Sequence, residues 1–157
     1  MRATLNIGDQ APPFAFTSAA GTPLTNESCL GQKLVLYFYP KDDTSGCTKE
    51  AIEFNHLRQD FASSDTTIIG VSPDSALSHE KFKAKHKLDL ELGSDEAKAT
   101  LEAYGVWAEK SMYGRKYMGV ERTTVLIDRG GKISKVWPNV KVPGHAAEVL
   151  EAARALS

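Results

Sequence analysis

The chain has 157 residues, the length of one globular domain of ordinary size, so we expect a single domain over residues 1–157. Hydrophobic residues make up 41% and charged residues 25%, proportions that exclude a disordered or fibrous chain. The 19 Lys and Arg residues nearly balance the 20 Asp and Glu residues, and the net charge of -1 provides no general attraction for nucleic acid or an anionic membrane.

The first nine residues turn polar before an apolar segment of signal-peptide length can form. The most apolar run, Leu34 to Tyr39, is far shorter than the roughly 20 residues that a membrane-spanning helix needs. There are two cysteines, too few for a disulfide-stapled scaffold, and they form no C-x-x-C pair that would indicate a zinc site or a dithiol motif. We therefore expect a cytoplasmic protein in which any functional cysteine acts as a single thiol.

The first half of the chain predicts a strand, a helix and a second strand. Lys33 to Tyr39 is apolar on both faces, as a strand buried within a sheet requires, and Pro40 ends it. From Cys47 to Phe61 apolar residues recur every three or four positions, which predicts a helix that Ser45 can cap. The β-branched segment Thr66 to Ser72 predicts the second buried strand.

Two helices and a loop are predicted next. Ser78 to His86 and Asp95 to Tyr104 have helical patterns, with Ser78 as the cap of the first and Ser94 or Asp95 as the cap of the second. Trp107 to Gly119 mixes Gly, Tyr, Met and basic residues without periodicity, which predicts a loop.

The last third of the chain predicts a hairpin and a final helix. Thr123 to Asp128 and Lys132 to Trp137 flank a Gly-rich turn and predict two paired strands. His145 to Leu156 carries one apolar stripe at helical spacing. Together the elements predict an α/β domain with a central mixed sheet flanked by helices.

One cysteine lies where the first strand gives way to the helix, in the sequence PKDDTSGCTKE from Pro40 to Glu50. The first helical turn supplies free backbone N–H groups and the positive end of the helix dipole, both of which favour a thiolate at Cys47. A helix terminus contributes at most about 2 kcal/mol, so an activated thiol needs a second cation. Thr44 lies three residues earlier, where its hydroxyl could contact the sulfur or an incoming oxygen, and Pro40 would stiffen the turn.

Most free cysteines are simply small buried side chains. The polar residues around Cys47 argue against a position in the core. Cys29 lies in a turn-like stretch at the opposite end of the predicted strand, and we expect it to be inert.

The run FYPKDDTSGCTKE resembles the P-x-x-x-T-x-x-C active-site loop of peroxiredoxins and is most similar to that of the bacterioferritin-comigratory (BCP), or PrxQ, branch. The similarity extends over nearly the whole chain, through GDQAPPF, GVSPDS, GVWAEKSMYGRKYMGVERTTVLID and the GH before the last helix. The resemblance implies a thioredoxin-like fold with an N-terminal extension. It also implies reduction of hydroperoxides at one cysteine, without metal or organic cofactor.

Carried over position by position, the resemblance makes Cys47 the peroxidatic cysteine, Thr44 and Pro40 the other loop positions, and Arg122 the active-site arginine. Arg122 immediately precedes a predicted strand and keeps its charge, so it fits the missing cation, although a solvated surface charge is the alternative. Three basic residues of the same region compete for this role: Lys110, Arg115 and Lys116. Glu50, one turn after Cys47, could orient the arginine or simply be an acid favoured in a first helical turn.

The chain departs from the family at the resolving cysteine. Many members of the branch carry it five residues after the peroxidatic one, where this chain has Ile52, or on the helix after the second strand, where Ser78 to Lys87 contains none. We therefore expect a 1-Cys enzyme of antioxidant defence that reduces hydrogen peroxide and organic hydroperoxides. Its sulfenic acid would be resolved by thioredoxin, glutaredoxin or a low-molecular-weight thiol, and we expect a monomer or weak dimer.

Other interpretations of the sequence stay open. A thiol-disulfide oxidoreductase would need a second cysteine where Glu50 stands. A cysteine hydrolase would need a histidine base, but the contexts of the histidines predict surface positions and show no metal-ligand spacing. The four are His56, His79, His86 and His145. A non-catalytic binding domain or thiol-based chaperone is the third alternative.

Three aromatic residues of the predicted loop have no assigned role. They could line a substrate entrance or a partner surface, or pack in the core. They are Trp107, Tyr113 and Tyr117.

Overall fold

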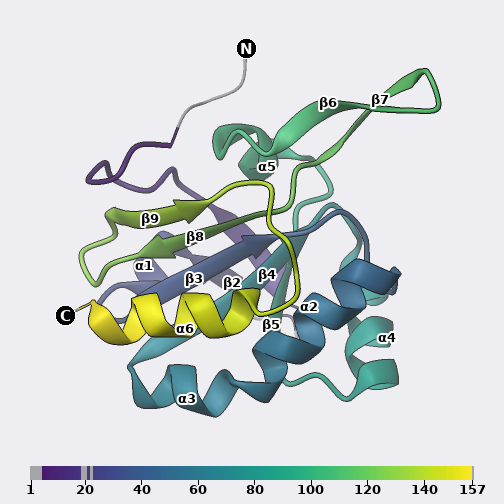
Figure 1. The fold of residues 1–157 in the computed structure, drawn as a ribbon. Coiled ribbons are helices and arrows are strands. Elements are labelled where there is room, and N and C mark those ends of the chain that lie inside the picture. The colour runs from purple at the N-terminus through teal and green to yellow at the C-terminus, as the bar shows by residue number, and fades with distance from the viewer. Residues whose placement is uncertain (1–4, 19–20, 22, 157) are drawn as a thin grey trace.

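A computed structural model describes residues 5–18, 21 and 23–156 of the chain. A seven-stranded mixed sheet runs through it in the order β2-β1-β5-β4-β3-β8-β9, and β6 and β7 form a separate two-stranded sheet (Figure 1). The strands are β1 (Ala15–Ser18), β2 (Pro23–Thr25), β3 (Lys33–Phe38), β4 (Thr66–Ser72), β5 (Glu91–Ser94), β6 (Trp107–Met112), β7 (Arg115–Val120), β8 (Thr123–Ile127) and β9 (Ile133–Trp137). The predicted α/β architecture with a central mixed sheet is confirmed.

Helices cover both faces of the large sheet. They are α1 (Asn26–Cys29), α2 (Ser45–His56), α3 (Arg58–Ser63), α4 (Ala76–His86), α5 (Ala99–Ala103) and α6 (His145–Ala155). Apolar residues of α2, α3, α4 and α6 form one core with alternate residues of β3, and α5 and the segment around Phe14 form a second core on the opposite face. In the described part of the chain no helix combines the length and the apolar character needed to cross a membrane.

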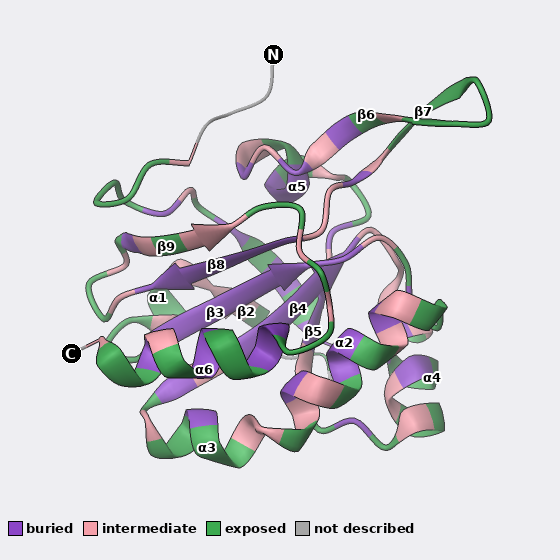
Figure 2. Ribbon diagram, in the orientation of Figure 1, coloured by how far each residue is buried: buried purple, intermediate pink, exposed green. Residues whose placement is uncertain are grey.

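The central strand β3 positions the loop that carries Cys47. All six of its residues are buried, because it pairs with β4 in parallel on one edge and with β8 antiparallel on the other (Figure 2). Val35 and Tyr37 face one core, whereas Leu36 and Phe38 face the other. A strand buried on both faces has no polar alternation, so the expectation of a buried strand here is confirmed.

The helix predicted from Cys47 to Phe61 is in fact two helices. α2 begins at Ser45 with Thr44 as its N-cap residue, not Ser45, and ends at His56; Leu57 separates it from α3, which begins at Arg58. The Arg58 guanidinium donates to the Asn55 carbonyl at 2.9 Å and satisfies one of the acceptors that α2 leaves free at its end. The apolar spacing continues across the break because both helices pack on the same core.

The next two helices start later or earlier than predicted. α4 begins at Ala76, and the Ser75 hydroxyl, not that of Ser78, accepts the capping bond from the backbone N–H of Ser78. α5 begins only at Ala99, because Lys98 has a left-handed backbone conformation (φ +63°) that interrupts any helix starting at Asp95. The Asp95 carboxylate instead accepts a hydrogen bond from the Leu101 N–H at 2.8 Å.

The expectation of a loop from Trp107 to Gly119 is wrong. This segment is a hairpin in which β6 and β7 pair from Trp107 opposite Val120 to Met112 opposite Arg115. Tyr113 and Gly114 form the turn with positive φ values of 52° and 75°, the geometry of a two-residue hairpin turn. The hairpin extends away from the main sheet (Figure 1), and its outer part is exposed on both faces (Figure 2). It therefore lacks the apolar alternation by which a strand is recognised in sequence.

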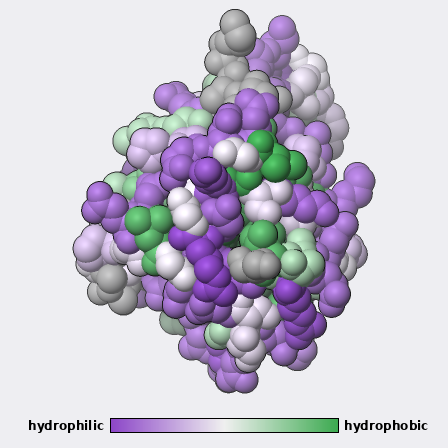
Figure 3. Space-filling view, turned by 90° about the vertical axis from the view of Figure 1, so that its left-hand side faces the viewer, coloured by the Kyte–Doolittle hydropathy of each residue, from purple (hydrophilic) through white to green (hydrophobic). Residues whose placement is uncertain are grey.

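The remaining elements include some that the sequence patterns did not predict. The hairpin β8–β9 and the helix α6 are confirmed, but the short elements β1, β2, α1 and β5 are new. The segment before β1 packs on the β8–β9 turn, where the Ala11 N–H donates to the Gly131 carbonyl at 2.9 Å. Residues 1–4, at the start of the expected N-terminal extension, lie outside the described part. On the face seen in Figure 3, apolar side chains form small areas separated by hydrophilic ones.

Candidate active site

Cys47 lies in the first turn of α2, immediately beyond the carboxyl end of the central strand. Its side chain is 2% exposed and belongs to the core on the α2 face of the sheet. The expectation that its polar neighbours would keep it out of the core is therefore wrong, because Cys47 lies on the same buried face of α2 as Ala51 and Phe54. Cys47 is a buried thiol at the edge of a core, and a charged group reaches it there.

That charged group is Arg122, which lies between β7 and β8. Its guanidinium forks between two partners: Nη2 donates to Cys47 Sγ at 3.3 Å, and Nη1 donates to Glu50 Oε1 at 2.6 Å. The close approach also explains Gly46, since a Cβ at that position would lie 3.2 Å from Arg122 Nη2 and press on it. The structure thus brings together Cys47, Arg122 and Glu50, three residues that the sequence places up to 75 positions apart.

Glu50 is the most enclosed member of this group. Its side chain is 1% exposed, and Oε2 has no hydrogen-bond partner within the described residues. Burial raises the pKa of Glu50 from its ordinary value of 4.5 to about 7, although the attraction of Arg122 acts in the opposite direction. Removal of the carboxylate from water thus outweighs its ion pair.

The pKa of Arg122 follows a different balance, because its side chain keeps 18% exposure and contacts both Glu50 and Cys47. Burial acts to lower this pKa, but the charges of and hydrogen bonds to Glu50 and Cys47 outweigh that effect and raise it. Arg122 is therefore the fixed positive charge of the site.

The three rival cations lie elsewhere. Lys110 is near enough for the charges of the site to change its pKa. Burial and then the charge of Arg122 lower this pKa, whereas Glu121 and Cys47 oppose the shift. Arg115 and Lys116 are exposed on the hairpin, where Lys116 lies 3.6 Å from Glu109.

An open groove of about 510 Å³ lies at the base of the hairpin and reaches Glu121, the residue before Arg122. Its lining is mixed in polarity and consists of Ala108, Glu109, Lys110, Glu121 and Asn139.

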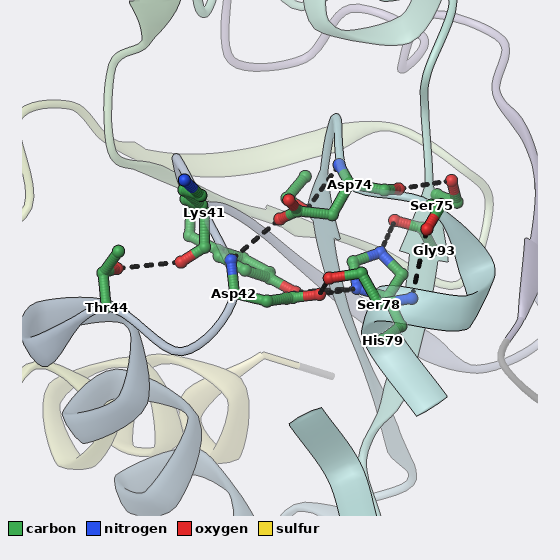
Figure 4. Close-up of polar contacts among 11 residues, drawn as sticks. Lys41, Asp42, Thr44, Asp74, Ser75, Ser78, His79 and Gly93 are labelled. Atoms are coloured by element: carbon green, nitrogen blue, oxygen red, sulfur yellow. Dashed lines mark hydrogen bonds and ion pairs between the residues drawn. The ribbon is translucent and has the colours of Figure 1, made fainter. Parts of the chain in front are cut away.

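Thr44 and Pro40 belong to the loop between β3 and α2. The Thr44 hydroxyl donates to the Lys41 carbonyl at 2.8 Å (Figure 4), and this residue makes no side-chain cap bond to α2. The first-turn N–H groups of α2 are therefore left without that capping oxygen. Pro40 is half-buried and follows Tyr39, the buried residue immediately after β3.

Two acidic residues of the same loop, which the sequence patterns did not single out, attach it to the rest of the protein. The Asp42 carboxylate accepts hydrogen bonds from the Tyr39 hydroxyl at 2.6 Å and from the Ser78 hydroxyl at 2.8 Å. The backbone N–H of Asp42 donates to the Asp74 carboxylate (Figure 4). The Asp43 carboxylate pairs with α4 at the surface, contacting Lys85 and His86 there.

The prediction that all four histidines are surface residues is wrong for His79 and His145. Both are buried, since α4 and α6 turn them toward the sheet. His145 Nε2 lies 2.8 Å from the Thr124 hydroxyl, and burial lowers its pKa. None of the four histidines is hydrogen-bonded to Cys47 in the described contacts. Among the described residues no group of three or more His, Cys, Asp or Glu side chains is arranged to hold a metal ion.

Cys29 lies far from this group in the fold. It is the last residue of α1, just before β3, and it packs against the core on the other face of the sheet from Cys47. Burial raises the pKa of its thiol, and a hydrogen bond with Ser28 opposes that shift in part.

The two aromatic residues near the hairpin tip, Tyr113 and Tyr117, are exposed, with Tyr113 at 97%. Trp107, at the hairpin base, is only partly buried and packs against the core around Phe14. The core interpretation thus applies to Trp107 alone among the three aromatics of this segment.

Comparisons with known proteins agree with this geometry. A family model described as the AhpC/TSA family matches residues 7–136. A putative peroxiredoxin bcp of Coxiella burnetii is 45% identical over 147 residues, which cover 94% of this chain and 97% of the relative. A Cys-to-Ser mutant of Xylella fastidiosa PrxQ superposes with a TM-score of 0.92 at 40% identity, with 98% of each chain covered.

A bacterioferritin comigratory protein of Xanthomonas campestris, whose structures were solved for insight into its alkyl peroxide reduction activity, has a TM-score of 0.88 at 40% identity, with 98% of each chain covered. These matches confirm the thioredoxin-like fold.

Proposed function

The chain belongs to the AhpC/TSA family and, within it, to the Bcp/PrxQ peroxiredoxins, so it is a thiol-dependent peroxidase, and we propose that Cys47 is its peroxidatic cysteine. The observation that carries this assignment is the Arg122 fork, with one nitrogen 3.3 Å from Cys47 Sγ and the other on Glu50. A fixed guanidinium beside a buried sulfur favours the thiolate over the neutral thiol.

In the proposed reaction the Cys47 thiolate attacks one oxygen of the hydroperoxide in line with the O–O bond. The S–O bond forms as the O–O bond breaks, so that Cys47 becomes a sulfenic acid and the other oxygen leaves as water or an alcohol after taking a proton. Arg122 and the first-turn N–H groups of α2 are already in place to stabilise the charge that develops on the leaving oxygen. Glu50 keeps the guanidinium oriented through its bond to Nη1.

We assign hydrogen peroxide and organic hydroperoxides as substrates. The groove at the base of the hairpin is open and combines apolar with charged lining, which suits an alkyl chain as well as a small polar molecule. The alkyl peroxide reduction activity named for the Xanthomonas campestris relative supports the organic substrates.

We further propose that the enzyme is of the 1-Cys type and works in the cytoplasm, where thiol reductants are kept reduced. The two cysteines flank the six buried residues of β3 and belong to opposite faces of the sheet. At about 3.3 Å per residue a strand of this length separates its ends by roughly 20 Å, whereas a disulfide needs Cα atoms within about 7 Å. An external thiol must therefore attack the sulfenic acid, form a mixed disulfide with loss of water, and be displaced by a second thiol.

The thiol count tests this assignment directly. One equivalent of hydrogen peroxide should remove one of the two thiols measured under denaturing conditions, with Cys47 trapped by a sulfenic-acid reagent and Cys29 left free. Steady peroxide consumption with dithiothreitol should vanish in Cys47→Ser and persist in Cys29→Ser. Loss of both thiols in a monomeric product would contradict the 1-Cys assignment, and a fully active Cys47→Ser variant would contradict the role of Cys47.

Thr44→Val should slow the oxidation of Cys47 by hydrogen peroxide about tenfold while changing the free energy of unfolding by less than about 1 kcal/mol. Thr44 is exposed, and its hydroxyl makes one bond to the Lys41 carbonyl, so valine removes a loop contact and a polar group near the reacting oxygens with little loss of packing. Stopped-flow oxidation rates and urea unfolding measure the two effects. Thr44→Ser, which keeps the hydroxyl, should retain most of the rate, and an unchanged rate in Thr44→Val would remove the hydroxyl from the step.

A further inference from the structure

His79 is fully buried, and both of its ring nitrogens face oxygen atoms. Nδ1 lies 2.7 Å from Asp42 Oδ2, and Nε2 lies 3.0 Å from the backbone carbonyl oxygen of Gly93 (Figure 4). A carbonyl oxygen can only accept a hydrogen bond, so Nε2 carries a proton. The protonation of the ring is then decided at Nδ1, where the partner is a carboxyl group.

The hydrogen bonds around Asp42 favour His79 as the donor in the contact between the two side chains. A carboxyl group is the stronger acid of the two by more than two pH units in water. Two further donors favour the ionised carboxylate, because the Tyr39 hydroxyl donates to Asp42 Oδ1 at 2.6 Å and the Ser78 hydroxyl donates to Oδ2 at 2.8 Å. The Tyr39 hydroxyl also lies 3.4 Å from Nδ1, but it donates its hydrogen bond to Asp42. The contacts therefore suit an ion pair in which His79 donates and Asp42 accepts.

This buried pair joins α4 to the loop that carries Cys47. Asp42 is the second residue after Pro40, and its backbone N–H donates to Asp74 Oδ2 at 2.8 Å, which ties the same residue to the loop after β4. The loop is therefore held from two sides before it enters α2. Arg122, by contrast, comes from the distant β7–β8 junction, so the distance between the Cys47 sulfur and the guanidinium depends on where the loop is held.

We propose that the Asp42–His79 ion pair sets the position of the Cys47 loop relative to Arg122, so that His79 is a positioning residue for peroxide reduction. This inference rests on the proposed function of Cys47. A misplacement of about 1 Å between reacting groups can cost up to about 10²-fold in rate, so a loosened loop should lower reactivity in a protein that still folds.

The loop offers its own control. Asp43 also contacts α4, through Lys85 and His86, but this cluster lies at the surface. In Asp43→Asn, hydrogen peroxide should therefore oxidise Cys47 at a rate within twofold of the wild-type rate. His79→Gln and Asp42→Asn should each slow the oxidation of Cys47 by hydrogen peroxide about tenfold. The double variant should be no more than twofold slower than the slower single variant, because the two changes remove the same interaction.

Two further measurements separate positioning from general loosening. The rate of Cys47 alkylation by iodoacetamide needs a thiolate but no arginine aligned on a leaving oxygen. Measured at a pH high enough to ionise Cys47 fully in both proteins, this rate should stay within twofold in His79→Gln, whereas a merely destabilised core should expose the thiol and accelerate alkylation. In wild-type protein labelled with ¹⁵N-histidine, the His79 ring should show protons on both nitrogens at pH 7.

A bare ring nitrogen in that spectrum would overturn the ion pair, and a wild-type oxidation rate in folded His79→Gln would overturn the positioning role. Should His79→Gln fail to fold, the spectrum of the wild-type protein still decides the ion pair, and the alkylation-to-oxidation ratio in Asp42→Asn decides positioning. Failure of the proposed function is distinct, since it would appear as slow oxidation of Cys47 in the wild-type protein itself.

Discussion

Arg122→Met should slow the oxidation of Cys47 by hydrogen peroxide by about 10²–10³-fold, the cost typical of losing one preorganised donor to a developing anion. Methionine keeps much of the side-chain volume but removes the bond to Cys47 Sγ and the bond to Glu50 Oε1. The loss combines a weaker preference for the thiolate with an unstabilised leaving oxygen. Stopped-flow measurement of the second-order rate constant, at a pH where both proteins are folded, gives the ratio directly.

Two variants make this test specific. Lys116→Met removes a positive charge from the exposed hairpin, where the ammonium lies 3.6 Å from Glu109, and should leave the rate unchanged. Arg122→Lys keeps a charge but cannot fork between two partners, so its rate should fall between those of the wild type and Arg122→Met. If Arg122→Met reacts as fast as the wild type, Arg122 has no part in the peroxidatic step.

Glu50→Gln should become more stable relative to the wild type as the pH rises from 4.5 to 7. The folded-state pKa of Glu50, about 7, exceeds its ordinary value of 4.5, so the folded protein binds more protons than the unfolded chain between these values. Wild-type stability from this group is complete below pH 4.5 and is lost as the pH rises through 7. Glutamine does not ionise and escapes this loss, which amounts to up to about 3 kcal/mol at pH 8.

Urea unfolding of both proteins at pH 4.5, 6 and 8 measures this difference. Gln at position 50 can still accept the Arg122 bond through its amide oxygen, so the comparison isolates the charge and not the contact. A difference in stability that stays constant across the three pH values would show that the Glu50 carboxylate is ionised at no cost in the folded protein. In the same variant Cys47 should oxidise more slowly. Removing the charge of Glu50 stabilises the fold but leaves the Arg122 guanidinium less firmly oriented.

The sequence is most informative about the centre of the molecule. β3 was predicted within one residue, because a strand buried on both faces must be apolar throughout, and the position of Cys47 at the start of α2 follows from the change of period after Pro40. Arg122 could be named only through the family resemblance, because a lone arginine before a strand has several equally good rivals nearby. Its fork to Cys47 and Glu50 depends on tertiary packing between α2 and the β7–β8 junction.

Other parts of the site could not be predicted for identifiable reasons. Local sequence gives no sign that His79 faces inward, because its neighbours on α4 are mostly polar and its partners lie in the loop after β3 and on β5. A sequence signal did exist for the hairpin in Tyr113-Gly114, a pair suited to a turn with positive φ, but the exposed strands beside it hid the pattern. Burial of Cys47 was missed because polar neighbours in sequence say little about which side of a helix meets the sheet.

The β6–β7 hairpin has a practical consequence for attaching this enzyme to a solid support. Its tip, at Tyr113 and Gly114, is exposed and stands clear of the main sheet (Figure 1). An affinity peptide inserted there would lengthen the turn between two strands that pair with each other and not with the main sheet. The entropic cost of lengthening a loop grows slowly, and exposed loop tips are where inserted sequence is best tolerated. The base of the hairpin should be left unaltered, because Lys110 and the groove that reaches Glu121 lie there.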